Sequence, residues 1–155
     1  MADDSYNTGV YHKQGGDELV VGSGGTMRMQ GIMYKKQGAP TAKTTANTMT
    51  IADLLTGIIT ATHTAGATAA YTLPTGALTE AGVTMDVDDS FEWTLINLSA
   101  AALDTVTVTA ATGHTIVGNA IVQSAHSSTG GVYGNSATFR TRKTATDTFV
   151  SYRVA

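Results

Sequence analysis

Large apolar and polar side chains alternate with a period of two along much of the chain. In residues 90–98, Phe91, Trp93 and Leu95 fall on one side, and the residues between them fall on the other. Residues 104–109 repeat the pattern with valine and threonine. Successive side chains of a β-strand point to opposite faces, so both stretches are predicted to be strands with one buried face.

Glycine-rich turns separate further short strands. Two hairpins are predicted, one from residues 113–117 and 119–123 around Gly118, the other from residues 136–142 and 148–154. The remaining elements are strands at 58–62 and 69–73 and single helical turns at 50–57 and 77–81. Seven or eight short strands with almost no helix predict an all-β fold, with a β-sandwich or jelly-roll-like body over residues 46–155.

Residues 1–45 follow another pattern, which predicts an extended N-terminal arm and a short β-ribbon. The arm spans residues 1–16, and the ribbon joins a strand at 17–22 to one at 26–34 through the turn Ser23-Gly24-Gly25. An isolated two-stranded ribbon is marginally stable in water. The ribbon must therefore rest on the body, on another subunit or on a partner.

The predicted core is thin for a body of this length. The small Ala and Thr faces suit flat packing against other sheets, so we expect burial between subunits to complete the stability. The large core candidates are Leu54, Ile58, Tyr71, Leu73, Phe91, Trp93, Leu95, Val106, Val108, Ile116, Ile121, Phe139, Phe149 and Tyr152.

Composition narrows the possible functions. Among 155 residues there are 28 Thr, 22 Ala, 17 Gly and no Cys, which excludes disulfides, thiolate metal sites and cysteine nucleophiles. Between Thr44 and Phe139 there are seven acidic residues and no Lys or Arg. The sequence lacks the dense cluster of Lys and Arg that is typical of nucleic-acid-binding proteins, so we expect no nucleic-acid partner. The short basic cluster Arg140–Lys143 is either a solvated strand end or an anion-binding or partner-facing patch.

Catalytic signals are weak. The histidines show no metal-ligand spacing and are expected to be solvated loop or strand-end residues; they are His12, His63, His114 and His126. The acidic cluster fits a solvated loop, a weak calcium site or an acid/base pair, and it contains Asp86, Asp88, Asp89 and Glu92. No G-x-S-x-G elbow occurs, and Gly22–Gly25 lacks the context of a phosphate loop. We therefore expect no enzyme activity, metal or cofactor.

Targeting signals are also absent. The acidic start, Met1-Ala2-Asp3-Asp4-Ser5, is unlike a signal peptide, and no apolar run is long enough to span a membrane. We expect synthesis in a cytoplasm and no membrane partner.

The stretch Tyr11–Gly25 (YHKQGGDELVVGSGG) resembles the opening of small tailed-phage head proteins, the capsid decoration (cement) and head-fibre proteins. The body is similar to the β domain of these proteins at Ala70–Gly76, Asp89–Trp93, Ile96–Asn97, Thr115–Asn119 and Thr138–Lys143. The resemblance implies a non-enzymatic virion component, a homotrimer seated on the outer capsid surface. Its partners would be the major capsid protein and other copies of itself.

Within this hypothesis residues 1–45 anchor the protein to the capsid or to other subunits, and the body faces solvent. Methionine suits adaptable contact surfaces, so the Met face of the ribbon packs either on the body or on a subunit or capsid. The candidate contact residues are Tyr11, His12, Lys13, Gln14, Leu19, Val20, Val21, Met27, Met29 and Met33. The inverted polarity, with the body docked on the capsid, stays open.

An alternative function is an adhesin or receptor-binding module that contacts host glycans. The polar loop at residues 124–135 would then carry the sugar contacts. Such a module favours exposed aromatic rings, whereas the alternation around Trp93 predicts that its indole is buried. A third possibility is a β-sandwich enzyme, but the sequence shows no group of polar residues that would come together as a catalytic site.

Overall fold

The computed structural model describes residues 10–12, 19–21, 26–28, 30–63, 68–101, 103–124 and 134–155. The chain divides into two compact units, residues 1–36 (unit 1) and residues 37–155 (unit 2). Each unit is described by itself.

Unit 1 contains an antiparallel ribbon of β1 (Val10–His12) and β2 (Leu19–Val21). The predicted strand at residues 26–34 is wrong, because residues 26–28 and 30–36 have no regular secondary structure. The predicted arm contributes β1, which takes the place of that strand beside β2. Alternation alone does not make a strand, since a strand also needs a neighbour for its backbone hydrogen bonds.

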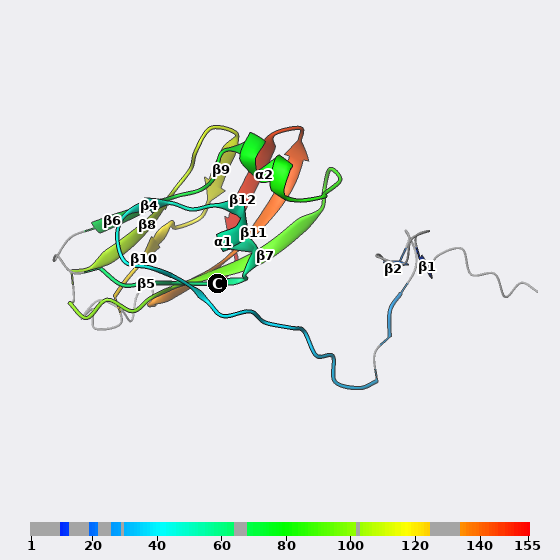
Figure 1. Ribbon diagram of the computed structural model, residues 1–155, viewed down its shortest axis with the longest axis horizontal. Helices are drawn as coiled ribbons and strands as arrows, with labels where there is room; N and C mark the ends of the chain where they lie inside the picture. The colour runs from blue at the N-terminus through cyan, green and yellow to red at the C-terminus, as the bar shows by residue number, and fades with distance from the viewer. Residues whose placement is uncertain are drawn as a thin grey trace, which may run out of the picture. The chain divides into compact units, whose positions relative to one another are not determined.

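Unit 2 contains two sheets and two short helices, α1 (Ile51–Leu55) and α2 (Gly76–Gly82). The six-stranded sheet has the order β3-β5-β7-β11-β12-β9 and the four-stranded sheet the order β10-β8-β6-β4. The strands are β3 (Thr41–Lys43), β4 (Asn47–Thr48), β5 (Ile58–Ala61), β6 (Thr68–Thr72), β7 (Ser90–Asn97), β8 (Thr105–Thr109), β9 (His114–Val117), β10 (Ile121–Val122), β11 (Ser136–Ala145) and β12 (Thr148–Arg153). Figure 1 shows the two sheets facing each other.

The chain alternates between these sheets from β3 to β10 (Figure 1), so no strand in this stretch pairs with the next one. Each of β3, β4, β5, β6 and β8 pairs with the second strand after it. Five of the eight strand pairings in the described part of unit 2 are parallel, among them β3–β5, β5–β7 and β6–β8. The predicted all-β sandwich or jelly-roll-like body is therefore wrong. Both sheets are mixed and two helices accompany them, whereas hairpin-connected sandwiches and jelly rolls are antiparallel.

The two hairpin predictions differ in outcome. The hairpin around Gly118 is wrong, because β9 joins the six-stranded sheet and β10 the four-stranded sheet. The C-terminal hairpin is confirmed, with β11 and β12 antiparallel and Arg140 opposite Tyr152. Residue 147, where the chain turns, is Asp147 with a φ of 53°, a left-handed conformation that Asp tolerates.

A single hydrophobic core lies between the sheets. Trp93 and Phe139 stack there with ring centroids 4.7 Å apart. Most of the predicted core residues are fully buried, but Ile121 is 39% exposed, and Ile58, Phe91, Ile116 and Tyr152 are only partly buried. The sequence prediction missed Met49 and Ile59, both at most 1% exposed.

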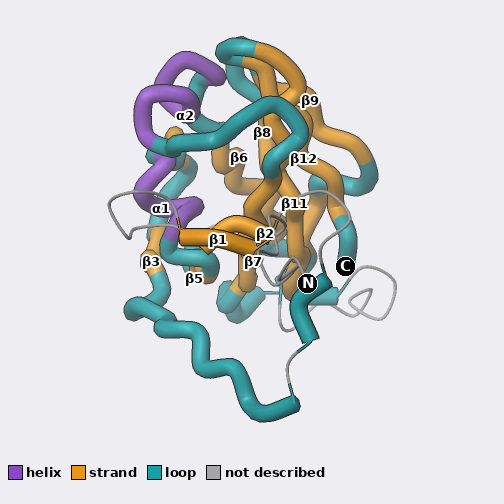
Figure 2. Tube along the Cα trace, turned by 90° about the vertical axis from the view of Figure 1, so that its right-hand side faces the viewer, coloured by secondary structure: helices purple, strands orange, loops and turns teal. Residues whose placement is uncertain are grey.

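Both helices form where the sequence predicts them. Thr50 caps α1 through a capping box with Asp53, and Thr75 caps α2 by accepting from the Leu78 amide. The helices lie on the same side of unit 2 (Figure 2). A Cβ at Gly82 would come within 2.3 Å of Ile51, so glycine permits this close approach of α2 to α1. No helix in the described ranges is long and apolar enough to cross a membrane.

Candidate functional site

The predicted contact residues of unit 1 fall in three groups. Tyr11 and His12 lie in β1, and Leu19, Val20 and Val21 lie in β2. The ribbon places Tyr11 opposite Val20 and His12 opposite Leu19. Lys13, Gln14 and Met29 lie outside the described residues. The structure thus joins two of the predicted clusters in one ribbon and leaves the methionines in a separate segment.

That separate segment, residues 26–36, exposes large apolar side chains to solvent. The exposed fractions are 57% for Met27, 80% for Ile32, 69% for Met33 and 89% for Tyr34. Single exposed apolar side chains are common, but a run of them marks an interaction surface. We call residues 26–36 the apolar segment.

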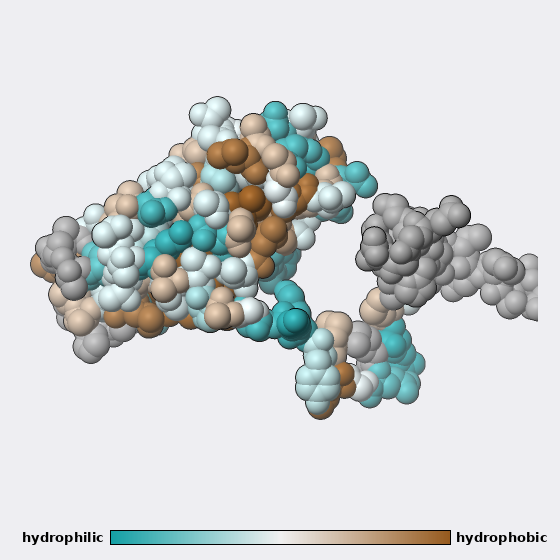
Figure 3. All heavy atoms as spheres, in the orientation of Figure 1, coloured by the Kyte–Doolittle hydropathy of each residue, from teal (hydrophilic) through white to brown (hydrophobic). Residues whose placement is uncertain are grey.

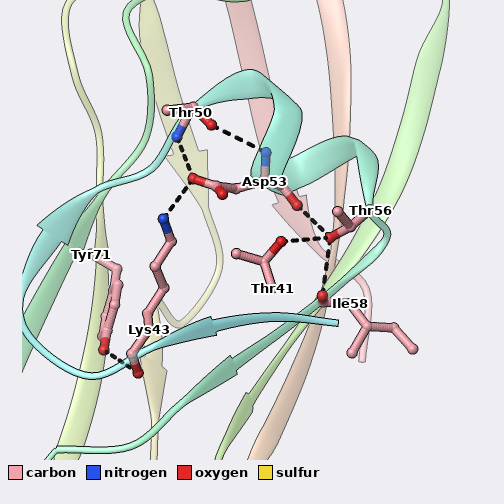
Figure 4. A network of polar contacts seen from close by, with 7 residues as sticks. All are labelled: Thr41, Lys43, Thr50, Asp53, Thr56, Ile58 and Tyr71. Atoms are coloured by element: carbon pink, nitrogen blue, oxygen red, sulfur yellow. Dashed lines mark hydrogen bonds and ion pairs between the residues drawn. The ribbon is translucent and has the colours of Figure 1, made fainter. Parts of the chain in front are cut away.

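A polar network fixes the chain where it enters unit 2 (Figure 4). The Lys43 ammonium of β3 lies 2.8 Å from the Asp53 carboxylate of α1, and both side chains are more than four-fifths buried. Burial alone would raise the pKa of Asp53, but hydrogen bonds from Lys43 and Thr50 outweigh it and lower that pKa. The sequence prediction placed residues 41–43 in a linker outside the body, whereas here they form β3 at the edge of the six-stranded sheet, held by α1.

The basic and acidic clusters of the sequence meet each other. Arg140 of β11 lies opposite Glu92 of β7, and its Nη2 is 2.5 Å from the Glu92 carboxylate. Arg142 forms an ion pair with Asp88. The cluster Arg140–Lys143 therefore lies within β11 with its charges paired: the Arg140 and Arg142 side chains stay partly solvated, and acidic partners neutralise them.

Lys143 carries the most buried of these charges, with 8% of the residue exposed. Its ammonium donates to the Glu80 carboxylate of α2 at 2.5 Å and to the Met85 carbonyl at 2.8 Å. The hydrogen bond from Lys143 lowers the pKa of Glu80. The pair ties α2 and the loop after it to β11.

The acidic loop is a tight turn and not an ion cradle. Asp89 accepts from the Asp86 amide at 2.9 Å, and Asp88 adopts a φ of 80°. Among the described residues, no group of three or more His, Asp or Glu side chains is placed to hold a metal ion.

His63 and His114 are buried, so their expected solvated positions are wrong. The His63 ring lies 3.1 Å from the Thr105 carbonyl. The His114 ring stacks on Phe149, and its Nε2 lies 3.1 Å from the Thr79 hydroxyl. Burial lowers the pKa of His114 to about 4, so the ring stays neutral at physiological pH. The side chain of His12 and the whole of His126 lie outside the part of the chain that the structure describes.

Buried polar groups that sequence reasoning missed gather at one end of the sheets. The Asn97 amide donates to the carbonyls of Asp104 and Val122, at 2.8 and 3.2 Å, and its Oδ1 accepts from the Ser99 amide. The Ser99 hydroxyl in turn accepts from the His63 amide at 3.0 Å. This arrangement satisfies strand ends and fits a structural role.

The outer face of the four-stranded sheet is uncharged in the part that the structure describes. Threonine hydroxyls bridge its strands in pairs, Thr68 with Thr105 and Thr72 with Thr109, each 2.8 Å apart. Paired hydroxyls satisfy one another, so covering this face would leave few polar groups without a partner. The face consists of Thr48, Thr68, Ala70, Thr72, Thr105, Thr107, Thr109 and Ile121.

The exposed, uncharged or apolar surfaces that could serve as contact surfaces are thus the apolar segment and the threonine face, while the charged side chains of β7, β11 and α2 are paired. Comparison with protein-family models, with curated proteins and with solved structures finds no match.

Proposed function

We propose that the chain is a non-enzymatic virion structural protein, a capsid decoration protein that coats or stabilises the outer surface of a phage head as a homotrimer. The resemblance of Tyr11–Gly25 to the opening of phage head proteins motivates the proposal. The observation that supports it best is the division of the chain into a compact unit 2 and a separate N-terminal unit with exposed apolar side chains.

In the proposed arrangement, the β1–β2 ribbon binds the major capsid protein and unit 2 faces solvent. A two-stranded ribbon gains stability by adding to the sheet edge of a partner. Three ribbons in one trimer bind together, so modest contacts give a high overall affinity. In the inverted polarity, the threonine face docks on the capsid instead.

The test is a sedimentation assay with purified phage heads that lack the protein. Deletion of residues 1–16 removes β1 and leaves unit 2 untouched, and we expect the truncated protein to stay with the supernatant. A matched control carries Ala70→Ser on the threonine face and should still sediment with heads. Unchanged sedimentation of the truncated protein contradicts ribbon-mediated binding, and failure of the control alone favours the inverted polarity.

The receptor-binding alternative lacks support in the described residues. Trp93, the sole tryptophan, is 1% exposed and stacks on Phe139, as the sequence predicted, so its indole does not face a sugar. Specific binding on a glycan array, together with no sedimentation with heads, would favour that alternative.

A further inference from the structure

An open groove of roughly 500 Å³ lies between the helices and the start of β7. Its apolar lining comes from Leu55, Val83, Met85 and Phe91, and Thr84 is a polar lining residue. Hydrophobic side chains gather over the helices of unit 2 (Figure 3). Among the lining residues, Leu55 is 51% exposed. We call this groove the α1–α2 groove.

The rim of the groove is acidic. Asp89 lines it, and Asp86 and Asp88 belong to the same exposed turn. The Asp88 charge is paired with Arg142. Two further carboxylates, those of Asp86 and Asp89, remain to attract a basic ligand.

The apolar segment has the complementary chemistry. Its exposed side chains include Met27, Ile32 and Met33, and methionine adapts to irregular apolar surfaces. Arg28, Lys35 and Lys36 give it a formal charge of +3, with no acidic residue between positions 26 and 36. An apolar, basic segment and an apolar, acid-rimmed groove match in both hydrophobicity and charge.

The attachment of the segment defines its reach. Gln37, the first residue of unit 2, donates its side-chain amide to the Thr56 carbonyl at 2.6 Å, directly beside Leu55 of the groove. Eleven extended residues span at most about 36 Å, which is enough to reach a neighbouring molecule. The segment thus leaves unit 2 close to the groove that it would fill in another copy.

We propose that residues 26–36 of one copy bind in the α1–α2 groove of a second copy. The second copy is the occupant because the proposed homotrimer needs a contact between copies, and binding within one chain is the outcome that the double-cysteine chain below tests. A contact between two different surfaces is heterologous, and such contacts close into a ring when the rotation permits. Three copies would form the proposed homotrimer, so the inference rests on the self-association part of the proposed function and not on capsid binding.

Disulfide trapping tests this contact, since the natural chain has no cysteine. Full-length Met33→Cys and Thr84→Cys variants, both at exposed positions, are co-expressed and oxidised. We expect a covalent dimer of one chain of each kind, in several-fold excess over the dimer from Met33→Cys with the control Ala70→Cys. Equal yields with Thr84→Cys and Ala70→Cys would overturn the proposal. A chain carrying both Met33→Cys and Thr84→Cys that links only to itself would also overturn it.

Charge reversal gives a second measurement on the same trap. Adding Lys35→Glu and Lys36→Glu to the Met33→Cys chain should lower the yield, and Asp86→Lys in the Thr84→Cys chain should restore it. Yields that do not respond at low salt would count against the acidic rim as the binding partner. The cross-linking experiment contains no phage heads, so its failure would contradict the contact between copies but not the binding to capsids. Normal cross-linking together with no binding to heads would contradict only the decoration function.

Discussion

At the scale of single residues, His114 shows how burial changes the chemistry of a side chain. The residue is 9% exposed, its ring stacks on Phe149 with centroids 5.3 Å apart, and burial lowers its pKa to about 4. In the unfolded chain the pKa of histidine is about 6.5. The unfolded state therefore binds a proton more tightly than the folded state between these two values.

Stability should consequently fall as the pH is lowered from 7 to 5. Protonation of His114 in the unfolded state costs roughly 2 kcal/mol of unfolding free energy over this range, and the loss continues down to the folded-state pKa. Urea unfolding at pH 7, 6 and 5 measures it. His114→Gln removes the titrating group and should flatten the profile. A variant profile as steep as that of the natural protein would assign the effect to other groups.

The ion pair between the buried Lys143 and the partly exposed Glu80 leads to a prediction about the relative stability of two variants. Glu80→Gln leaves the ammonium with the Met85 carbonyl, 2.8 Å away, but without a counter-charge. We expect this variant to be less stable than the double variant Glu80→Gln/Lys143→Met, because removing both charges removes the cost of an unpaired buried one. The urea midpoints of the two variants decide it, and a less stable double variant would show that buried Lys143 tolerates the loss of its counter-charge.

At the scale of elements, the helices were predictable and the strand partners were not. Thr50 and Asp53 carry a local start signal, because the capping box depends on residues three apart. In contrast, alternation around Trp93 shows which face of β7 is buried but not whether its neighbour runs parallel. Pairing of β5 with β7 depends on a chain path through the other sheet, which no short stretch encodes.

The start of α2 depends on glycine. A Cβ at Gly76 would lie 1.8 Å from the Asp147 carbonyl oxygen, which is backbone and cannot rotate away. Gly76→Ala should therefore destabilise the protein by about 1–3 kcal/mol, in the range for overpacking. Gly38 is the matched control, because nothing lies within 4 Å of its added Cβ. Thermal melts of both variants test this, and equal melting temperatures would refute the close contact.

The candidate site was predictable only in outline. The methionine pattern pointed to residues 26–34 as a contact surface, and the exposure of Met27 and Met33 is compatible with that hypothesis. The acidic rim and the basic cluster were visible as charges, but their pairing was not, because Arg140 and Glu92 meet only through the β7–β11 register. The groove itself arises from elements distant in sequence, since Leu55 and Phe91 come together only in the folded unit.

At the scale of the whole molecule, the uneven distribution of basic residues makes the two units separable by trypsin. Arg28, Lys35 and Lys36 are exposed in the apolar segment, whereas residues 44–139 contain no Lys or Arg. Cleavage in the segment should release unit 2 as a fragment that begins at Gln37. The cleavage rate in the segment therefore reports on whether it is covered.

If the segment fills the groove of a neighbouring copy, cleavage after Lys35 and Lys36 should slow as protein concentration rises, because assembly follows mass action. High salt should restore fast cleavage by screening the contact between the basic segment and the acidic rim. Mass spectrometry of timed digests follows the fragment that begins at Gln37, and a trypsin substrate peptide added to each digest controls for protease activity. A cleavage rate that is independent of protein concentration would mean that the segment stays uncovered, and the chain would then lack the exchanged contact that holds its copies together.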